Sequence, residues 1–136
     1  MNRTICFFIL MALFFMQMGC DETNSSIERI SMDFPHGETR LLVQKHGDAF
    51  LFYGALPQSQ KIKNSVFDID ELYTQLQPRL HDNVPREKWP NPNSKSGMVT
   101  ITFDNNEQRD YLIFDEEEFA DRLFNKAKNN IVGKRP

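Results

Sequence analysis

The sequence predicts an α+β domain in which a mainly antiparallel four-stranded sheet packs against two helices on one of its faces. Two observations support this class. Segments with the composition of strands occur in pairs joined by short turns, and each pair precedes a segment whose apolar residues recur at helical spacing. The expected order is therefore ββα-ββα. A chain of 136 residues is long enough for one domain rather than two.

The first pair of strands is expected at 39–45 and 49–55. The first segment contains two Leu and a Val, the second is rich in aromatic residues, and the intervening 46–48, with its glycine, has the composition of a turn. Residues 57–65 are mostly polar and are expected to form a connection without regular structure.

The first helix is expected to begin at Asp68, whose carboxylate can accept a hydrogen bond from the amide of Glu71 in a capping box. The apolar residues that follow recur at intervals of three and four, as one helical face requires. They are Ile69, Leu72, Tyr73, Leu76 and Leu80. Pro78 is expected to end or kink this helix near Gln77.

The second pair of strands is expected at 98–103 and 109–114, after a proline-rich loop over 81–97. The second helix follows at once, with Asp115 and Glu118 at the spacing of another capping box. Both helices would therefore begin with Phe-Asp-x-x-Glu. This similarity leaves open whether the two ββα units arose by duplication, because any two capped helices could share it.

The N-terminal end differs in composition from the rest of the chain. Residues 5–16 form an apolar run of 12 residues, which Arg3 precedes and a polar, acidic segment follows. This is the pattern of a secretory signal peptide. The run is shorter than the roughly 20 apolar residues that a membrane-spanning helix needs.

The run ends in Met16-Gln17-Met18-Gly19-Cys20, which resembles the lipobox of bacterial lipoproteins. The family usually has Leu and Ala or Ser where this chain has Gln17 and Met18. The resemblance implies cleavage after Gly19 and attachment of lipid to Cys20. Asp21 follows directly, as in the inner-membrane retention signal of enterobacterial-type lipoproteins. An uncleaved anchor and plain secretion are the alternatives.

The resulting organisation has a signal peptide at 1–19, a lipid-attached polar tether at 20–36 and a single domain at 37–136. This domain contains no cysteine, which excludes thiolate catalysis and thiolate metal sites. Its three histidines, His36, His46 and His81, are not spaced as metal ligands. The sequence therefore predicts no catalytic residue, metal or cofactor. A net charge of −3 without a basic segment argues against nucleic acid as a partner.

The loop at 81–97 contains the only tryptophan of the chain, Trp89, with Arg86 and Lys88 nearby. Tryptophan and arginine are enriched at binding hot spots, and prolines lower the entropic cost of ordering a loop. These three residues are therefore candidates for binding a protein partner. The alternative is that Trp89 folds back over the sheet as a lid.

The expected function is that of a small, lipid-anchored protein of the bacterial cell envelope that faces the periplasm. It would bind a protein partner through the open sheet face or the Trp89 loop, without catalysis. Two alternatives remain: an immunity or inhibitor lipoprotein that neutralises an exported effector, and an envelope hydrolase.

Overall fold

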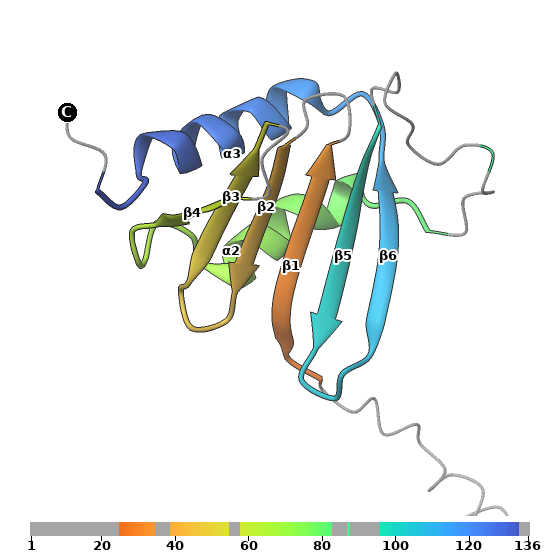
Figure 1. Cartoon of the computed structure of the whole chain (residues 1–136). Helices are drawn as coiled ribbons and strands as arrows, with labels where there is room; N and C mark the ends of the chain where they lie inside the picture. The colour runs from red at the N-terminus through yellow and green to blue at the C-terminus, as the bar shows by residue number, and fades with distance from the viewer. Residues whose placement is uncertain (1–24, 35–38, 55–57, 83–86, 88–95, 134–136) are drawn as a thin grey trace, which may run out of the picture.

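The computed structural model describes residues 25–34, 39–54, 58–82, 87 and 96–133. Within these ranges the chain forms one sheet and two α-helices (Figure 1). The strands are β1 (Ile27–Phe34), β2 (Thr39–Gln44), β3 (Ala49–Tyr53), β4 (Ser59–Ile62), β5 (Gly97–Phe103) and β6 (Gln108–Ile113). The helices are α2 (Ile69–Leu76) and α3 (Glu117–Asn129), and a short 3₁₀ turn, η2 (Gln77–Arg79), follows α2.

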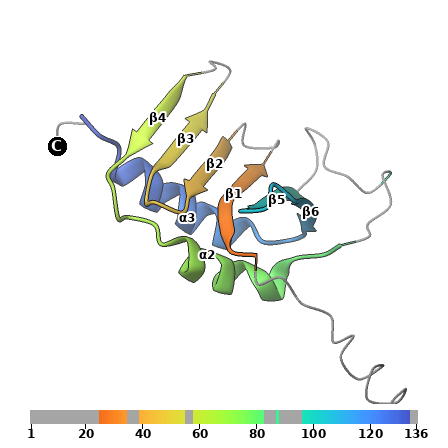
Figure 2. The same cartoon turned by 90° about the horizontal axis from the view of Figure 1, so that it is seen from below.

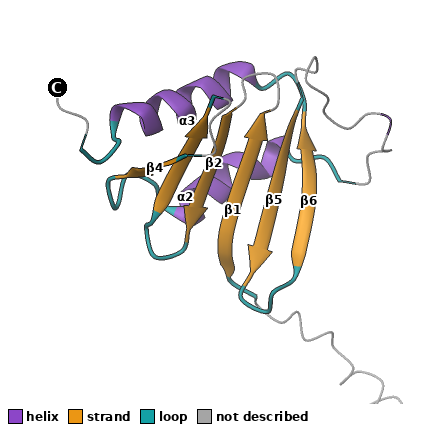
Figure 3. Ribbon diagram, viewed as in Figure 1, coloured by secondary structure: helices purple, strands orange, loops and turns teal. Residues whose placement is uncertain are grey.

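The six strands form a single antiparallel sheet in the order β4-β3-β2-β1-β5-β6 (Figure 3). The two predicted hairpins, β2–β3 and β5–β6, are both present. β1 lies between them and pairs with β2 on one side and β5 on the other. The sheet is therefore continuous across both hairpins.

The α+β class and the packing of both helices on one face are confirmed, but the expectation of four strands is wrong. β1 lies in the segment 20–36, which was expected to be a tether. Ile30, Met32 and Phe34 alternate with polar residues, and their buried side chains face the helices. Ile27 also reaches the core, because a bulge at Glu28 shifts the pairing with β5 by one residue. The domain therefore begins before residue 37.

β4 is the second strand that the sequence did not reveal. It lies in the polar connection expected at 57–65, and only Ile62 in it is apolar and fully buried. Ile131, after α3, forms a bridge with Ile62, and backbone hydrogen bonds join Lys63 to Asn130 and Val132 to Lys61. This contact covers the outer edge of β4, which is a common protection of sheet edges against unwanted pairing.

Both helices lie on the same side of the sheet, as the view along its edge shows (Figure 2). The core fills the space between the two layers. From the strands it takes mainly Ile30, Met32, Leu41, Val43, Leu51, Val99, Ile101 and Ile113, and from the helices Ile69, Leu72, Leu76, Phe119, Leu123, Phe124 and Ala127. Burial of each large apolar side chain contributes roughly 1.5–3 kcal/mol. None of the described helices is both long and apolar enough to cross a membrane.

The two helices begin differently. Asp68 caps α2 as predicted, since its Oδ1 accepts a hydrogen bond from the amide of Glu71 at 2.8 Å. The predicted cap at Asp115 is wrong: Glu116 occupies the N-cap position without a side-chain bond, and Asp115 has a φ of 54°. The shared Phe-Asp-x-x-Glu spacing therefore does not correspond to a shared cap.

Candidate functional site

The face of the sheet opposite the helices, here called the outer face, carries no other helix or strand of the described part of the chain (Figure 2). Its side chains alternate along each strand with those of the core. The side chains on the outer face include those of Arg29, Ser31, Asp33, Arg40, Leu42, Phe50, Phe52, Met98, Thr100, Thr102, Gln108 and Asp110.

The part of the outer face over β2 and β3 is apolar. Leu42 lies directly opposite Phe50, and Phe52 is the next outward-facing residue along β3. All three side chains are half-buried although no described element covers them. Opposed side chains in an antiparallel pair lie close enough to touch, so these residues form one patch. Apolar patches with a polar rim are typical of interaction surfaces.

A charged pair lies next to this patch, where β2 meets β1. Arg40 is directly opposite Asp33 and donates to its Oδ2 from Nε at 3.0 Å and also from Nη2. The Arg40 side chain is 54% exposed, so an ion pair of this kind contributes only about 0.2–1 kcal/mol to stability. Its main effect is to order two charges at the rim of the apolar patch.

The part of the outer face over β1, β5 and β6 is polar, apart from Met98 and its directly opposed, buried neighbour Leu112. Arg29 lies opposite Thr102, and Ser31 lies opposite Thr100. The Thr100 hydroxyl donates to Asp110 Oδ1 at 2.7 Å, and Gln108 Nε2 donates to Thr102 Oγ1 at 3.4 Å.

The middle of the outer face is hollowed, with a volume of about 330 Å³. The hollow is lined by Leu42 of β2 and Phe52 of β3, by Arg29 of β1, and by Met98 and Thr102 of β5. It lies in the size range of binding sites for small groups. One surface thus combines apolar residues, an ordered ion pair and hydrogen-bond donors.

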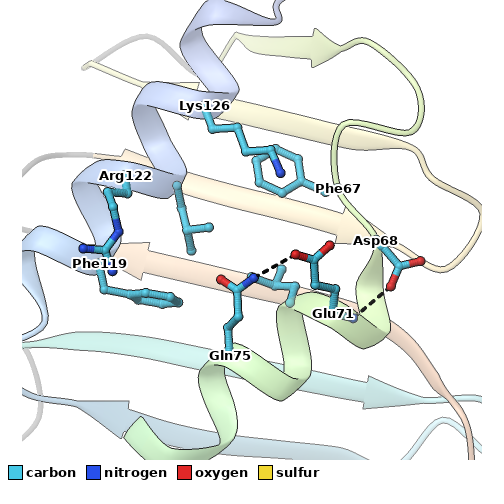
Figure 4. Close-up of a pocket in the computed structure, with 9 residues that line it drawn as sticks. Phe67, Asp68, Glu71, Gln75, Phe119, Arg122 and Lys126 are labelled. Atoms are coloured by element: carbon cyan, nitrogen blue, oxygen red, sulfur yellow. Dashed lines mark hydrogen bonds between the residues drawn. The ribbon is translucent and has the colours of Figure 1, made fainter.

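A second, smaller hollow of about 160 Å³ lies between α2 and α3 (Figure 4). Lys126 Nζ lies 5.1 Å from the centre of the Phe67 ring, and the Arg122 guanidinium lies 5.9 Å from that of Phe119. Asp68 and Glu71 line the α2 side. The two cations lie over aromatic rings that line this hollow. Such contacts stabilise the packing of side chains and leave the cations less available to a ligand. The outer face is therefore the stronger candidate for a binding site.

The described histidines do not form a reactive group with their surroundings. His46 is exposed in the β2–β3 turn, and His81 is exposed near Phe114, with ring centres 5.3 Å apart. Neither lines either hollow. Among the residues that the structure describes, no three His, Cys, Asp or Glu side chains are grouped so that they could hold a metal ion. His36 lies outside those residues.

The candidate site residues of the sequence, Trp89, Arg86 and Lys88 for partner binding and Cys20 for lipid attachment, all lie outside the described residues. The structure does place His81, near the start of the proline-rich loop. Its amide donates to the Leu112 carbonyl and its carbonyl accepts from the Leu112 amide, both at 2.8 Å. The loop therefore leaves the domain beside β6.

The sequence-based reasoning missed the polar half of the outer face, because Arg29 and Ser31 lie in the segment 20–36 that was expected to be a tether. The sequence nevertheless contains a signal for this strand. From Ile30 to Phe34 the chain alternates apolar and polar residues strictly, which is typical of a half-buried strand.

Comparison of the chain with protein-family models, with curated proteins and with solved structures gives no match. The outer face must therefore be interpreted from its own chemistry.

Proposed function

We propose that this chain is a lipid-anchored protein of the bacterial cell envelope that binds a protein partner through the outer face of its sheet, without catalysis. The observation that carries the proposal is the patch of Leu42, Phe50 and Phe52 on a face that no described element covers. Leaving these side chains in contact with water is unfavourable unless another surface covers them.

The composition of the outer face favours a protein as the partner. Protein interfaces combine an apolar centre with a polar rim, and aromatic residues, Met and Arg are enriched in them. Here Leu42, Phe50 and Phe52 supply the apolar centre, and the Arg40–Asp33 pair lies at its rim beside Phe52. Cations and carboxylates are mixed on this face, unlike the basic surfaces that bind nucleic acids.

The proposed anchor is Cys20, on the lipobox-like segment that precedes it. Six residues, 21–26, separate Cys20 from the start of β1. At about 3.3–3.6 Å per extended residue they span roughly 20 Å. This tether is much shorter than one ending at residue 36, so a partner must approach within a short distance of the membrane.

The described part of the domain begins with a fixed contact at Ser26. Ser26 is held at the β5–β6 turn, where its hydroxyl and amide both bind the Asp104 carboxylate and its carbonyl accepts from the Asp104 amide. The tether therefore joins the domain at one end of the sheet (Figure 1). The outer face lies to the side of this end (Figure 1).

Affinity capture from membranes of a producing bacterium tests the binding role. The bait is the full chain, either unchanged or carrying Phe52→Asp. Since the substitution places a charge in the apolar patch, we expect recovery of the partner to fall at least tenfold. Val132→Asp, at an apolar residue that is 54% exposed after α3, is the matched control and should leave recovery unchanged. Equal recovery with all three baits would contradict the proposal.

Mass spectrometry of the N-terminal fragment of the membrane-bound protein tests the anchor. We expect the fragment to begin at Cys20 and to carry a diacylglyceryl thioether. A fragment that retains Met1 would mean an uncleaved anchor, and an unmodified, soluble product would mean plain secretion.

A further inference from the structure

Arg29 is a cation of the outer face that has no carboxylate partner among the described residues. It is exposed on β1, directly opposite Thr102 of β5. The other cations of this face are paired: Arg40 binds Asp33, and Lys61 Nζ lies 3.0 Å from Asp48 Oδ1. Arg29 therefore keeps the five N–H donors of its guanidinium available.

The carboxylates of the outer face are already engaged. Asp33 Oδ2 accepts both bonds from Arg40, and Asp110 Oδ1 accepts the Thr100 hydroxyl. Neither carboxylate bonds to Arg29. Since no described carboxylate pairs with Arg29, an anion from outside the described part of the domain can bind to it.

Two hydroxyl groups line the same hollow as Arg29 and can donate to the same anion. The Ser31 hydroxyl makes no hydrogen bond to the described part of the chain. Thr102 is only 7% exposed, and its Oγ1 accepts from Gln108 Nε2, which leaves its own proton to donate. One positive charge and two neutral donors thus lie on one side of the hollow.

We infer that this corner of the outer face binds a carboxylate, supplied by an Asp or Glu side chain of the protein partner. The inference rests on the proposed function, because it takes the outer face as the binding surface. A single guanidinium matches the single charge of a carboxylate better than the nearly double charge of a phosphate monoester. Leu42 and Phe52, on the other side of the hollow, would contact apolar residues next to the acidic one.

Two peptides that differ in one group test the inference. The probes are acetyl-Leu-Asp-Phe-amide and acetyl-Leu-Asn-Phe-amide, titrated into the full, ¹⁵N-labelled chain in lipid nanodiscs. Binding is followed by NMR at the amides of Ser31 and Thr102. We expect the Asp peptide to bind about tenfold more tightly than the Asn peptide, since hydrogen bonds between charged groups are roughly twice as strong as neutral ones. The preference should weaken at high salt.

Arg29→Gln is expected to abolish the preference for the Asp peptide. The matched control is Arg122→Gln, which removes the same group from α3 on the other side of the sheet and should keep the preference. The inference is wrong if neither peptide binds, if both bind equally, or if the preference survives in Arg29→Gln.

These outcomes separate the inference from the proposed function. If capture of the partner depends on Phe52 but the peptides show no preference, the outer face binds a partner without this carboxylate contact. If the preference holds but capture does not depend on Phe52, the carboxylate site stands and the proposed function falls.

Discussion

At the scale of single residues, a close contact occurs where β5 begins. A Cβ placed on Gly97 would lie 2.6 Å from the Cε1 and Cζ atoms of Phe34, which is closer than such atoms approach in proteins. The Phe34 ring is itself held against Phe124, with ring centres 5.5 Å apart and the planes at 84°. Only a glycine allows β5 to pass beneath this aromatic pair.

We therefore expect Gly97→Ala to lower the free energy of unfolding by about 1–3 kcal/mol, as overpacked cores do. Urea unfolding followed by circular dichroism measures this. The control is the double variant with Phe34→Leu, in which the smaller side chain makes room for the methyl group. If the costs of the two substitutions simply add, the Phe34 ring is not the obstacle.

The start of the domain depends on another single residue, Asp104. Hydrogen bonds from the side chain and the backbone of Ser26 lower the pKa of Asp104 below its ordinary value of 3.8. A carboxyl group whose pKa is lower in the folded state stabilises the fold above its unfolded pKa. That contribution disappears as the pH falls through the folded value.

Asp104→Asn should therefore destabilise the domain at neutral pH, and the difference from the unchanged protein should shrink as the pH falls below 3.8. Unfolding by urea between pH 2 and pH 7 measures it. Ser26→Ala removes part of the same contact, so its effect should not add fully to that of Asp104→Asn. A constant difference at every pH would show that the Asp104 charge is not involved.

At the scale of elements, both helices meet the sheet through apolar faces of similar spacing but begin by different means. α2 has a side-chain cap at Asp68, whereas α3 follows β6 through Asp115 in a left-handed conformation. α3 instead has Glu117 and Glu118 in its first turn and Lys126 and Lys128 in its last, an order that suits the helix dipole.

Asp68→Ala is expected to cost about 1 kcal/mol of stability, the usual effect of losing an N-cap. Asp68→Asn should cost much less, because the amide oxygen can still accept from the Glu71 amide. Thermal or urea unfolding of the two variants gives the comparison. Equal losses would mean that the charge of Asp68 matters and the cap does not.

The edge of β4 gives a further prediction. Ile131 is 6% exposed and covers Ile62, so Ile131→Ala should cost about 2–5 kcal/mol. It should also speed hydrogen exchange at the Lys63 amide, which donates to Asn130. Val132→Ala, at the exposed neighbour, should change stability by less than about 0.5 kcal/mol. Unchanged exchange at Lys63 in Ile131→Ala would argue against the covering role.

Elements with local signals were predictable from the sequence. The turn at 46–48, the cap at Asp68 and the stop at Pro78 each act over a few neighbouring residues, and the structure has them as expected. β4 was not predictable, because its burial depends on Ile131, distant in sequence. Asp115 has the spacing of a cap, but the path of the chain from β6 prevents it from acting as one.

At the scale of the whole molecule, the position of β1 determines the outer face. β1 joins two hairpins into one sheet, so residues from three separate segments share one surface. The sequence predicted an open sheet face, but not which side chains it carries. Two features follow from the register of β1, a non-local property: Arg40 pairs with Asp33, and Arg29 pairs with no carboxylate of the described residues.

The central claim is that the outer face binds a partner in the envelope, and site-specific photo-crosslinking in living cells tests it most directly. A benzophenone amino acid replaces Phe50 or Phe52 on the outer face, or Asp121 or Asn125 on the exposed side of α3. The claim predicts that one defined crosslinked species forms from positions 50 and 52 and not from 121 or 125. Crosslinks from α3 with none from the outer face would contradict it.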